Sequence, residues 1–575
     1  MGKSFRITTA VLFAVLTALS TGCSENESSL RIIVTTDVHG NIFSEDLLSG
    51  EMVAGSMSRV STFAGMEGPD NVILLDNGDN LQGTPAVYYY NFEDTLSEHL
   101  WASVLNYIGY DAVTVGNHDF EAGHSVYDRI RLQYNFPMLA ANAINISTGD
   151  PWFEPFTIIE RDGYRVAVIG LVTPGVPGWL PEVLYEGISF GDMLESAAYW
   201  MERVEKEKPD LVVGLFHAGW NEEYGPGTAG SYLNQNASER IAREVPGFDM
   251  IFIGHDHDVL TREIINVSGD TVLMIDAGSH ARYMGVADVV FKKGKGRGNH
   301  DIRGYLVRSD SIEADRRFDE RFREQYNTVR DYVARGIGTL QFDLFTGDAL
   351  FGDSPVMDLI HTVQLETTGA DISFAAPLSF NVTIESGPLY VRDMFDLYRY
   401  ENMLYSLSMQ GDEIDAYLEY SYGLWSSKMS SGESRMLKYD TDSDDYRLKN
   451  RYYNFDSAEG IEYVVDLSRE EGNRVTITGM TDGRPFYNDS LYAVAVNSYR
   501  GSGGGGHLES GSRIPASEIE GRIIRSTEKD LRYYMMKWIE AEGTIDIRAN
   551  NNWRFIPAEW TERASDREKR ALFNN

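Results

Sequence analysis

Five short polar motifs in the first half of this chain carry residue types that bind divalent metal ions. Each follows an apolar run, and they are Asp37-Val38-His39, Gly78-Asp79-Asn80, Gly116-Asn117-His118-Asp119, His217 and Gly254-His255-Asp256-His257. Their mixture of carboxylate, amide and imidazole ligands suits Zn, Mn, Fe or Co and does not choose among them. Two such ions about 3.5–4 Å apart are a common device for hydrolysing phosphate esters. The motifs therefore predict a hydrolase that uses two divalent metal ions.

The apolar runs before these motifs predict the strands of an α/β fold. Runs that predict strands are Arg31–Thr35, Val72–Leu75, Ala112–Val115, Arg165–Leu171, Leu211–Phe216, Met250–Ile253, Val272–Ile275 and Gly285–Phe291. Amphipathic stretches such as Thr95–Ile108 and Met193–Lys206 predict helices between them. Strands that alternate with helices indicate a layered α/β architecture, in which ligands gather at the carboxyl ends of strands. The five motifs fall at those ends.

The second half of the chain has a different texture, rich in Tyr and Phe. Helices are expected at Val356–Thr367 and Gly411–Ser421, and strands at Ile461–Asp466, Val475–Thr478 and Leu491–Asn497. This pattern favours a separate α+β domain. We predict an α/β domain over residues 31–305, a linker helix within 306–338, a second domain over 339–557 and a poorly ordered tail over 558–575.

The N-terminus has the pattern of an export signal. Lys3 and Arg6 precede the apolar stretch Ile7–Leu19, and Gly22-Cys23 follows. The pattern resembles a bacterial lipoprotein signal, which implies cleavage after residue 22, lipidation of Cys23 and a tether over residues 23–30. We therefore expect an exported protein of the bacterial cell envelope, in the periplasm or on the outer surface, that meets the membrane only through this lipid anchor. A plain secreted form is the alternative.

The charge of the chain limits its partners. The formal net charge is −36, which disfavours duplex nucleic acid because phosphate binding needs a Lys/Arg surface. An acidic protein still takes an anionic substrate where metal ions reverse the local field. A small anionic substrate is compatible with this composition, and a monomer is favoured.

The five motifs resemble, one by one, those of the calcineurin-like metallophosphoesterase superfamily. The longer run Gly78-Asp79-Asn80-Leu81-Gln82-Gly83 resembles its 5′-nucleotidase branch in particular. The resemblance covers about residues 31–530. It implies a four-layer αββα metallophosphoesterase domain, a connecting helix and a C-terminal α+β nucleotidase domain. It also implies two metal sites that share Asp79: one holds Asp37, His39, Asp79 and His257, and the other holds Asp79, Asn117, His217 and His255.

The resemblance assigns a separate role to His118. This residue corresponds to the imidazole that binds no metal in the family and that stabilises the transition state and assists the leaving oxygen. Family members orient this imidazole with an acid three positions later, which is Glu121 here. Asp119 is the rival partner.

The second domain is expected to select the substrate. Tyr400 and Tyr499 stand where relatives sandwich a nucleotide base, a contact that tolerates any base. The resemblance also points to Asn117, Asn454 and Asp456 as substrate-binding residues. Ala375-Ala376-Pro377 stands where 5′-nucleotidases carry Asn-Gly-Gly-x-Arg, and this segment resembles bacterial 2′,3′-cyclic-nucleotide 2′-phosphodiesterase/3′-nucleotidases.

The expected reaction is attack on the phosphorus of a small nucleotide by a hydroxide that bridges the metals. The cyclic diester opens first, and the same site then releases phosphate. Three alternatives stay open. One is a 5′-nucleotidase or nucleotide-sugar hydrolase, and another is a sulfur esterase, since such relatives share the metal motifs. The third, of a different class, is a non-catalytic surface-binding lipoprotein.

Overall fold

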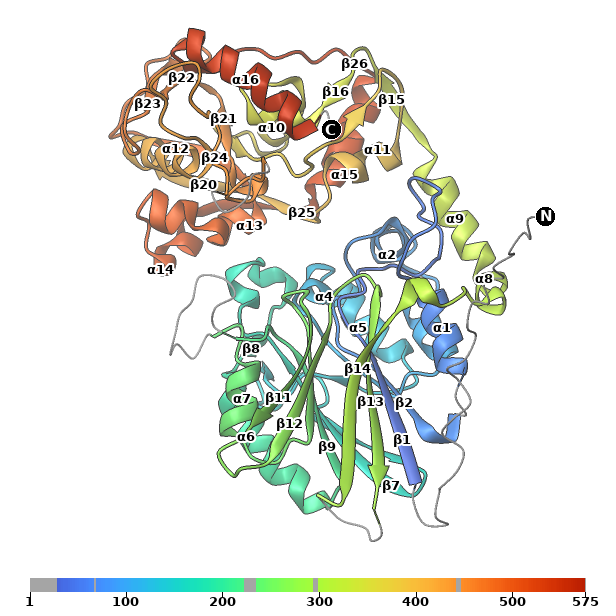
Figure 1. The fold of residues 1–575 in the computed structure, drawn as a ribbon. Helices are drawn as coiled ribbons and strands as arrows, with labels where there is room; N and C mark the ends of the chain where they lie inside the picture. Colours follow the sequence, from blue (N-terminus) through green and yellow to red (C-terminus); the bar gives the residue numbers. More distant parts are fainter. Residues whose placement is uncertain (1–27, 67–68, 222–233, 293–297, 441–445, 574–575) are drawn as a thin grey trace, which may run out of the picture.

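The computed structural model describes residues 28–66, 69–221, 234–292, 298–440 and 446–573, which form two domains joined by a helical connector (Figure 1). The predicted signal, residues 1–22, and Cys23 lie outside the described residues. Ser28, assigned above to the tether, already pairs with Phe291 in a sheet. The first strand is therefore three residues longer at its start than predicted.

The first sheet of the N-terminal domain has six strands in the order β14-β13-β1-β2-β3-β4. Their bounds are β1 Ser28–Thr35, β2 Val72–Asp76, β3 Ala112–Thr114, β4 Met138–Leu139, β13 Tyr283–Phe291 and β14 His300–Arg308. Strands β1 to β4 are parallel, and β13 and β14 add an antiparallel edge. The carboxyl ends of β1, β2 and β3 therefore lie at one edge of the sheet.

The second sheet has the order β11-β12-β10-β9-β7-β6. Its strands are β6 Phe156–Arg161, β7 Tyr164–Val172, β9 Leu211–His217, β10 Met250–Ile253, β11 Val259–Ile265 and β12 Thr271–Ala277. The four central strands are parallel, and the outer two are antiparallel to their neighbours. His217 is thus the last residue of a buried parallel strand.

Alternation along the strands explains how the two sheets stack. In β1, Ile32 and Val34 face a core between the sheets, while Ile33 faces the helices outside. In β7, Val168 faces the core between the sheets and Ile169 faces the helices outside. Successive side chains of a strand point to opposite faces, so both faces of each sheet are buried.

Helices cover the two outer faces. On the first sheet lie α1 (Met57–Gly65), α3 (Leu100–Ile108) and α5 (His124–Gln133), and on the second lie α6 (Met193–Val204) and α7 (Ser238–Glu244). The predicted four-layer αββα arrangement is confirmed.

The C-terminal domain is α+β, as predicted. Its main sheet has the order β21-β17-β24-β20-β25, with bounds β17 Ile372–Ala375, β20 Met403–Gln410, β21 Ser457–Glu459, β24 Leu491–Asn497 and β25 Ile523–Asp530. A second sheet joins β22 (Ile461–Asp466), β23 (Val475–Met480) and β27 (Trp553–Ile556). The principal helices are α10 (Pro355–Thr368), α11 (Val391–Leu397), α12 (Gly411–Trp425) and α15 (Leu531–Glu542).

The connector predicted as one linker helix within residues 306–338 is not a single helix. It is two helices, α8 (Arg316–Arg321) and α9 (Arg323–Val333), which meet at Phe322. Phe318 and Phe322 are both buried in the N-terminal core, with ring centroids 4.8 Å apart. Strands occupy the two ends of the 306–338 segment, because β14 runs to Arg308 and β15 (Gly336–Leu340) begins the second domain.

The expectation of a poorly ordered tail is wrong. Residues Ala558–Phe573 form helix α16, in which Glu568 is fully buried. The Glu568 carboxylate accepts hydrogen bonds from the backbone N–H groups of Met436 and Leu437 and from the Tyr439 hydroxyl, at 2.7, 3.1 and 2.7 Å. A charged residue therefore anchors the helix, which the weak apolar periodicity did not reveal.

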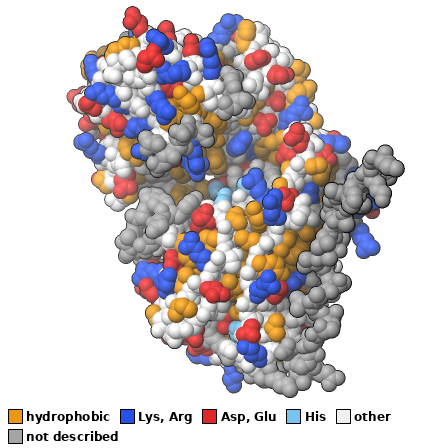
Figure 2. Space-filling model, in the orientation of Figure 1, with side chains coloured by type: hydrophobic (Ala, Val, Ile, Leu, Met, Phe, Trp, Pro, Cys, Tyr) orange, Lys and Arg blue, Asp and Glu red, His pale blue; other side chains and the backbone are white. Residues whose placement is uncertain are grey.

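The two domains contact each other through α2 (Pro85–Tyr88) of the N-terminal domain. Tyr88 is buried among residues of the C-terminal core, and its hydroxyl donates to Asp530 Oδ2 at 3.0 Å. The Arg532 guanidinium lies 4.9 Å from the centroid of the same ring. Figure 2 shows histidine side chains at the hollow where the domains meet. Within the described residues, no helix combines the length and apolar character that crossing a bilayer requires.

Candidate active site

The predicted metal ligands lie on tight loops at the carboxyl ends of the parallel strands. Five of them have a left-handed backbone, with φ of 50° at Asp37, 49° at His39, 58° at Asp79, 78° at His255 and 60° at His257. Residues other than Gly rarely adopt this conformation, which costs about 1–3 kcal/mol each and clusters at functional sites. The fold therefore holds this edge in a strained arrangement.

Backbone hydrogen bonds join these loops to one another. The Asp37 and His39 N–H groups donate to the carbonyls of Gly78 and Asp79 at 3.0 and 2.9 Å. The His255 N–H donates to the Asp37 carboxylate at 3.2 Å. Loops from β1, β2 and β10 are thus fixed relative to each other by main-chain hydrogen bonds and by the Asp37 carboxylate.

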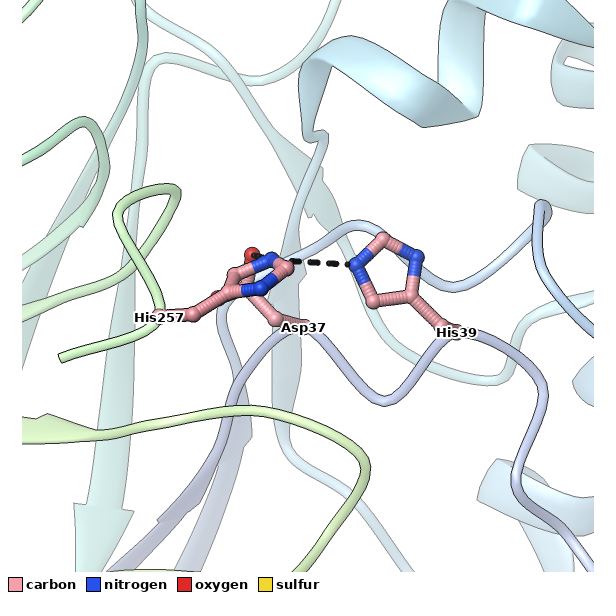
Figure 3. Close-up of side chains that lie close together, drawn as sticks. All are labelled: Asp37, His39 and His257. Carbon is pink, nitrogen blue, oxygen red and sulfur yellow. Dashed lines mark hydrogen bonds and ion pairs between the residues drawn. The ribbon is translucent and has the colours of Figure 1, made fainter. Parts of the chain in front are cut away.

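The first group of candidate ligands is Asp37, His39 and His257, whose ligand atoms all lie within 4.8 Å of one another (Figure 3). The His39 ring must donate through Nδ1, because its partner is the Gln82 carbonyl at 3.3 Å. Its Nε2 lone pair then faces His257 Nε2 at 3.2 Å, and His257 Nε2 lies 3.3 Å from Asp37 Oδ1. Two imidazole nitrogens, from His39 and His257, and one Asp37 carboxylate oxygen therefore lie close together.

The second group is Asp79, His217 and His255, with the same 4.8 Å limit. His217 donates through Nδ1 to the Asn77 carbonyl at 2.7 Å, which leaves a lone pair on Nε2. This lone pair faces Asp79 Oδ2 and Asn117 Oδ1, each at 3.1 Å. Asn117 thus joins the group as predicted.

The protonation of four ligands, Asp37, Asp79, His39 and His255, suits metal binding. Burial would raise the pKa of Asp37, but the His217 and His257 imidazoles outweigh it and lower that pKa to about 2. The pKa of Asp79 is also lowered well below its ordinary value, against burial, chiefly by His217 and His118. Burial lowers the pKa values of His39 and His255 to about 3. Ionised carboxylates and neutral imidazoles are the forms that bind metals.

The residues present fit two divalent cations. In each group, one imidazole, His39 or His217, donates through Nδ1 to a backbone carbonyl and directs Nε2 toward the other ligands, the usual outer support of metal-bound histidine. Burial would lower the pKa of His217, but Asp79 and Asp37 raise it to about 9. The pair of carboxylates therefore attracts positive charge to this position.

His118 lies beside the first group, with its ring centroid 5.4 Å from that of His39. Its Nδ1 donates to Glu121 Oε1 at 2.7 Å. Burial would lower the pKa of His118, but Glu121 and Asp79 raise it to about 10. The ring is thus oriented by the acid three positions later.

The alternative in which Asp119 orients His118 is wrong. The Asp119 carboxylate accepts four backbone hydrogen bonds, from Gly116, Asp79, Asn80 and Leu81, at 2.7–3.0 Å. It therefore holds the loop that follows β2. This is a structural role, and it sets the position of Asp79.

The substrate-binding residues predicted in the second domain are two tyrosines, Tyr400 and Tyr499, and two polar residues, Asn454 and Asp456. Tyr400 is 37% exposed, and its ring centroid lies 6.4 Å from that of Tyr453. Tyr499 is half-buried and packs against Gly504, where a Cβ atom would meet the ring at 2.5 Å. Burial and Tyr453 raise the pKa of Tyr400 to about 12. Tyr400 thus lies against Tyr453, while Tyr499 packs against the glycine run and lies 5.5 Å from the Arg500 guanidinium.

Asp456 is not available to a substrate, which corrects its assignment. It is 2% exposed, and its carboxylate accepts from Arg500 Nε and Nη2 at 2.9 and 2.8 Å and from the Tyr417 hydroxyl. Asn454 Oδ1 accepts from Arg500 Nη1 at 3.3 Å and remains half-buried. Asp456 therefore holds Arg500 in place on the short helix α13 (Ser498–Gly501), which also carries Tyr499.

Two residues beside the metal ligands were not predicted. The Trp179 ring centroid lies 5.3 Å from that of His255, and the His280 centroid lies 5.4 Å from that of His39. His280 also has a left-handed backbone, and its N–H donates to the Asp37 carbonyl at 2.7 Å. Its place just after β12, at a strand carboxyl end, was the available signal. Trp179 gave none.

Comparisons with known proteins agree with this geometry. The calcineurin-like phosphoesterase family matches residues 30–259, and the 5′-nucleotidase C-terminal domain family matches residues 336–510. A 2′,3′-cyclic-nucleotide 2′-phosphodiesterase/3′-nucleotidase of Yersinia enterocolitica is 26% identical over 95% of this chain and 91% of its own.

Two further proteins resemble this chain in sequence or in fold. The trifunctional nucleotide phosphoesterase YfkN of Bacillus subtilis is 26% identical over 92% of this chain, which spans only 39% of that protein. A Staphylococcus aureus structure assigned as a 5′-nucleotidase superposes with a TM-score of 0.75 at 20% identity, over 92% of this chain and 100% of the other.

The fold and the site together define a metal-dependent phosphoric ester hydrolase. More particularly, the chain belongs to the calcineurin-like phosphoesterases that carry a 5′-nucleotidase C-terminal domain.

Proposed function

We propose that this protein hydrolyses 2′,3′-cyclic nucleotides to 3′-nucleotides and then releases phosphate from the 3′-nucleotides. The observation that carries the proposal is the pair of adjacent ligand groups, Asp37/His39/His257 and Asp79/His217/His255, beside the His118–Glu121 pair. When bound, two divalent cations supply Lewis acidity and a nucleophilic water at neutral pH. Asp79, which contacts His217 and the His118 backbone, is the proposed shared ligand.

His118 is the proposed catalytic residue that serves the leaving oxygen. Its Nδ1 proton is held by Glu121, which fixes the ring and leaves Nε2 for contact with the substrate. A hydrogen-bonding imidazole at the departing ribose oxygen stabilises the charge that develops there. Asn117 Oδ1 faces His217, so the same side chain presents its amide N–H₂ group to the opposite side as a donor for a phosphoryl oxygen.

The proposed preference for cyclic and 3′-nucleotides rests on the second domain. In the segment Ala375-Ala376-Pro377-Leu378-Ser379, Ala375, Ala376 and Leu378 are buried, and the Ser379 hydroxyl donates to the Asp396 carbonyl. No guanidinium stands in this segment, where the 5′-nucleotidase pattern places one for the α-phosphate. Tyr400 and Tyr499 are the proposed base-stacking residues, which supports a nucleotide as substrate.

The test is phosphate release from 2′,3′-cAMP, 3′-AMP and 5′-AMP by the purified full chain, after chelation and then with Zn, Mn, Fe or Co added back. We expect hydrolysis of the first two substrates, dependent on added metal. A preference for 5′-AMP would replace the proposal with a 5′-nucleotidase. Failure to hydrolyse any of the three with every metal would favour a binding lipoprotein.

We also propose export and lipidation at Cys23. The basic start, the 13-residue apolar stretch Ile7–Leu19 and Gly22-Cys23 support this proposal. Labelling with a palmitate analogue in a bacterial host is expected to mark the wild-type protein. The variant Cys23→Ser should lose the label and leave the membrane fraction, and label retained on that variant would contradict the proposal.

A further inference from the structure

Arg532, in the first turn of α15, binds the backbone of the loop that carries Tyr400. This Tyr400 loop is residues 398–402, between α11 and β20. Arg532 is fully buried, and its Nε and Nη2 atoms donate to the carbonyls of Tyr398 and Arg399 at 3.0 and 2.7 Å. One guanidinium therefore holds the two carbonyls that come directly before Tyr400.

The same guanidinium contacts the N-terminal domain. It lies 4.9 Å from the centroid of the Tyr88 ring, a distance at which a cation is attracted to an aromatic face. The Tyr88 hydroxyl donates to Asp530 Oδ2 at 3.0 Å, while Asp530 Oδ1 accepts from the Tyr533 N–H at 3.0 Å and so caps α15. One side chain of the N-terminal domain thus contacts both Asp530 and Arg532 at the start of this helix.

Tyr88 is in turn close in the chain to the candidate metal ligands. It ends α2, the short helix that follows the loop carrying Asp79. Thr84, the residue before α2, donates from its hydroxyl to the Gly40 carbonyl at 2.8 Å, and Gly40 directly follows His39. The position of Tyr88 is therefore set by the same loops that hold the ligands.

The Tyr400 loop also lies within electrostatic range of the proposed catalytic pair. Glu401 is 5% exposed, and its Oε1 atom lies 3.7 Å from Arg532 Nη1. Burial raises the pKa of Glu401 to about 8 against the opposing effect of Arg532, and the Glu121 carboxylate adds to the rise. The residue after Tyr400 is thus near enough to feel the charge of the acid that orients His118.

We propose that Arg532 is a positioning residue, which sets the place of the Tyr400 ring relative to the candidate metal ligands by holding the Tyr400 loop beside Tyr88. This inference rests on the proposed function, in which Tyr400 stacks on the base. A nucleotide has a limited span between its base and its phosphorus, so the stacking ring must be held at a matching distance from the reacting atoms. Arginine suits this role, because its planar guanidinium donates in two directions while its face lies on an aromatic ring, which a lysine ammonium cannot do.

The experiment is a kinetic double-mutant cycle on the full chain, with wild type, Arg532→Lys, Tyr400→Ala and the double variant. Arg532→Lys should raise the KM for 2′,3′-cAMP by about 5–20-fold, less than the loss of a whole stacking contact, because the ring is displaced and not removed. The KM for bis-p-nitrophenyl phosphate, which has no base, should equal that of the wild type. In the Tyr400→Ala background, Arg532→Lys should leave the KM for 2′,3′-cAMP unchanged, because two residues that act through one contact are not additive.

Arg548→Lys is the matched control and should keep the wild-type KM, because the Arg548 guanidinium also lies over an aromatic ring, that of Phe342 at 3.9 Å, but with an exposed side chain. If Arg532→Lys does not fold, Tyr88→Phe decides, since it removes only the bond to Asp530 and should raise the same KM by about 2–10-fold.

Three results would overturn the positioning role: an unchanged KM for 2′,3′-cAMP in the variant that folds, KM values raised alike for both substrates, or additive effects in the cycle. A wild type that hydrolyses no nucleotide would instead count against the proposed function, so the two failures are distinguishable.

Discussion

The two domains present their candidate functional residues in different ways. In the N-terminal domain, the predicted metal ligands lie at the ends of buried parallel strands, and five of them have a positive φ. In the C-terminal domain, Tyr400 stands on a loop and Tyr499 on the short helix α13 (Ser498–Gly501), where the neighbouring Arg500 pairs with the buried Asp456. Reaction chemistry needs fixed positions, whereas base stacking tolerates variation, so rigid strand ends suit the first, while a loop and a short helix outside the sheets suffice for the second.

The largest loss of activity is expected from a substitution of Asp79, the proposed ligand of both metal ions. Asp79→Asn should lower kcat/KM for 2′,3′-cAMP by more than about 10²-fold and reduce the bound metal, because changes even in the outer support of a metal cost 10–100-fold. Metal analysis and steady-state kinetics measure this. Asp162→Asn is the matched control, since Asp162 also has a positive φ of 47° but lies in the turn between β6 and β7. Full activity in Asp79→Asn would remove the proposed shared ligand.

A smaller loss of activity is expected where a substitution impairs catalysis but leaves the metal bound. His118→Ala should lower kcat by about 10²–10⁴-fold while the metal content stays unchanged. Glu121→Gln should cost less, since it acts through the orientation of His118. His124→Ala is a matched control, because His124 also pairs with an acid on a helix, Asp128, at 2.9 Å. A loss of metal in His118→Ala would make His118 a ligand.

The contrast between the two domains predicts that substitutions of the stacking tyrosines in the second domain raise the KM for nucleotides. Tyr400→Ala and Tyr499→Ala should each raise KM for nucleotides by about 5–150-fold, because stacking is worth about 1–3 kcal/mol per base. The KM for bis-p-nitrophenyl phosphate, which has no base, should not change. Tyr487→Ala, an exposed tyrosine of the same domain, is the control. Equal KM changes for both substrates would argue against base stacking.

The smallest expected effect is on the pH dependence of the unfolding free energy. Burial lowers the pKa of His361 to about 3, and its ring contacts the Ser373 and Ser457 hydroxyls at 2.9 and 3.2 Å. The unfolded chain therefore binds this proton first, near pH 6.5, and stability falls as the pH drops from about 6.5 toward 3. His361→Gln should reduce the slope of the unfolding free energy in that window by up to about 1.4 kcal/mol per pH unit. Above pH 7.5 the difference between the two proteins should be constant, and an unchanged acid slope would contradict the assignment.

The strand-end motifs made the N-terminal fold and the candidate ligands predictable. A polar residue directly after an apolar β-branched run lies at a sheet edge whatever the details of packing, and parallel strands bring such edges together. The expected strand at Met250–Ile253 has those bounds in the structure, and the one at Leu211–Phe216 is short by a single residue. The fold class and the class of enzyme followed from this local pattern, and both are confirmed.

Contacts between distant segments were not predictable in the same way. Asp119 and Asp456 carry the same carboxylate as Asp79, yet the fold directs the first to four backbone N–H groups and buries the second against Arg500. The α16 helix depends on one buried carboxylate, Glu568, which receives the N–H groups of a segment about 130 residues earlier.

The sequence by itself determined which atoms could bind metals and at which end of the sheets they would lie, because side-chain chemistry and strand polarity are local properties. Only the tertiary structure decided which carboxylates face an ion and which face the backbone. It also placed Trp179 and His280 beside the ligands. The reason is physical: the partner of a buried charge is chosen by long-range packing, which no short stretch of sequence encodes.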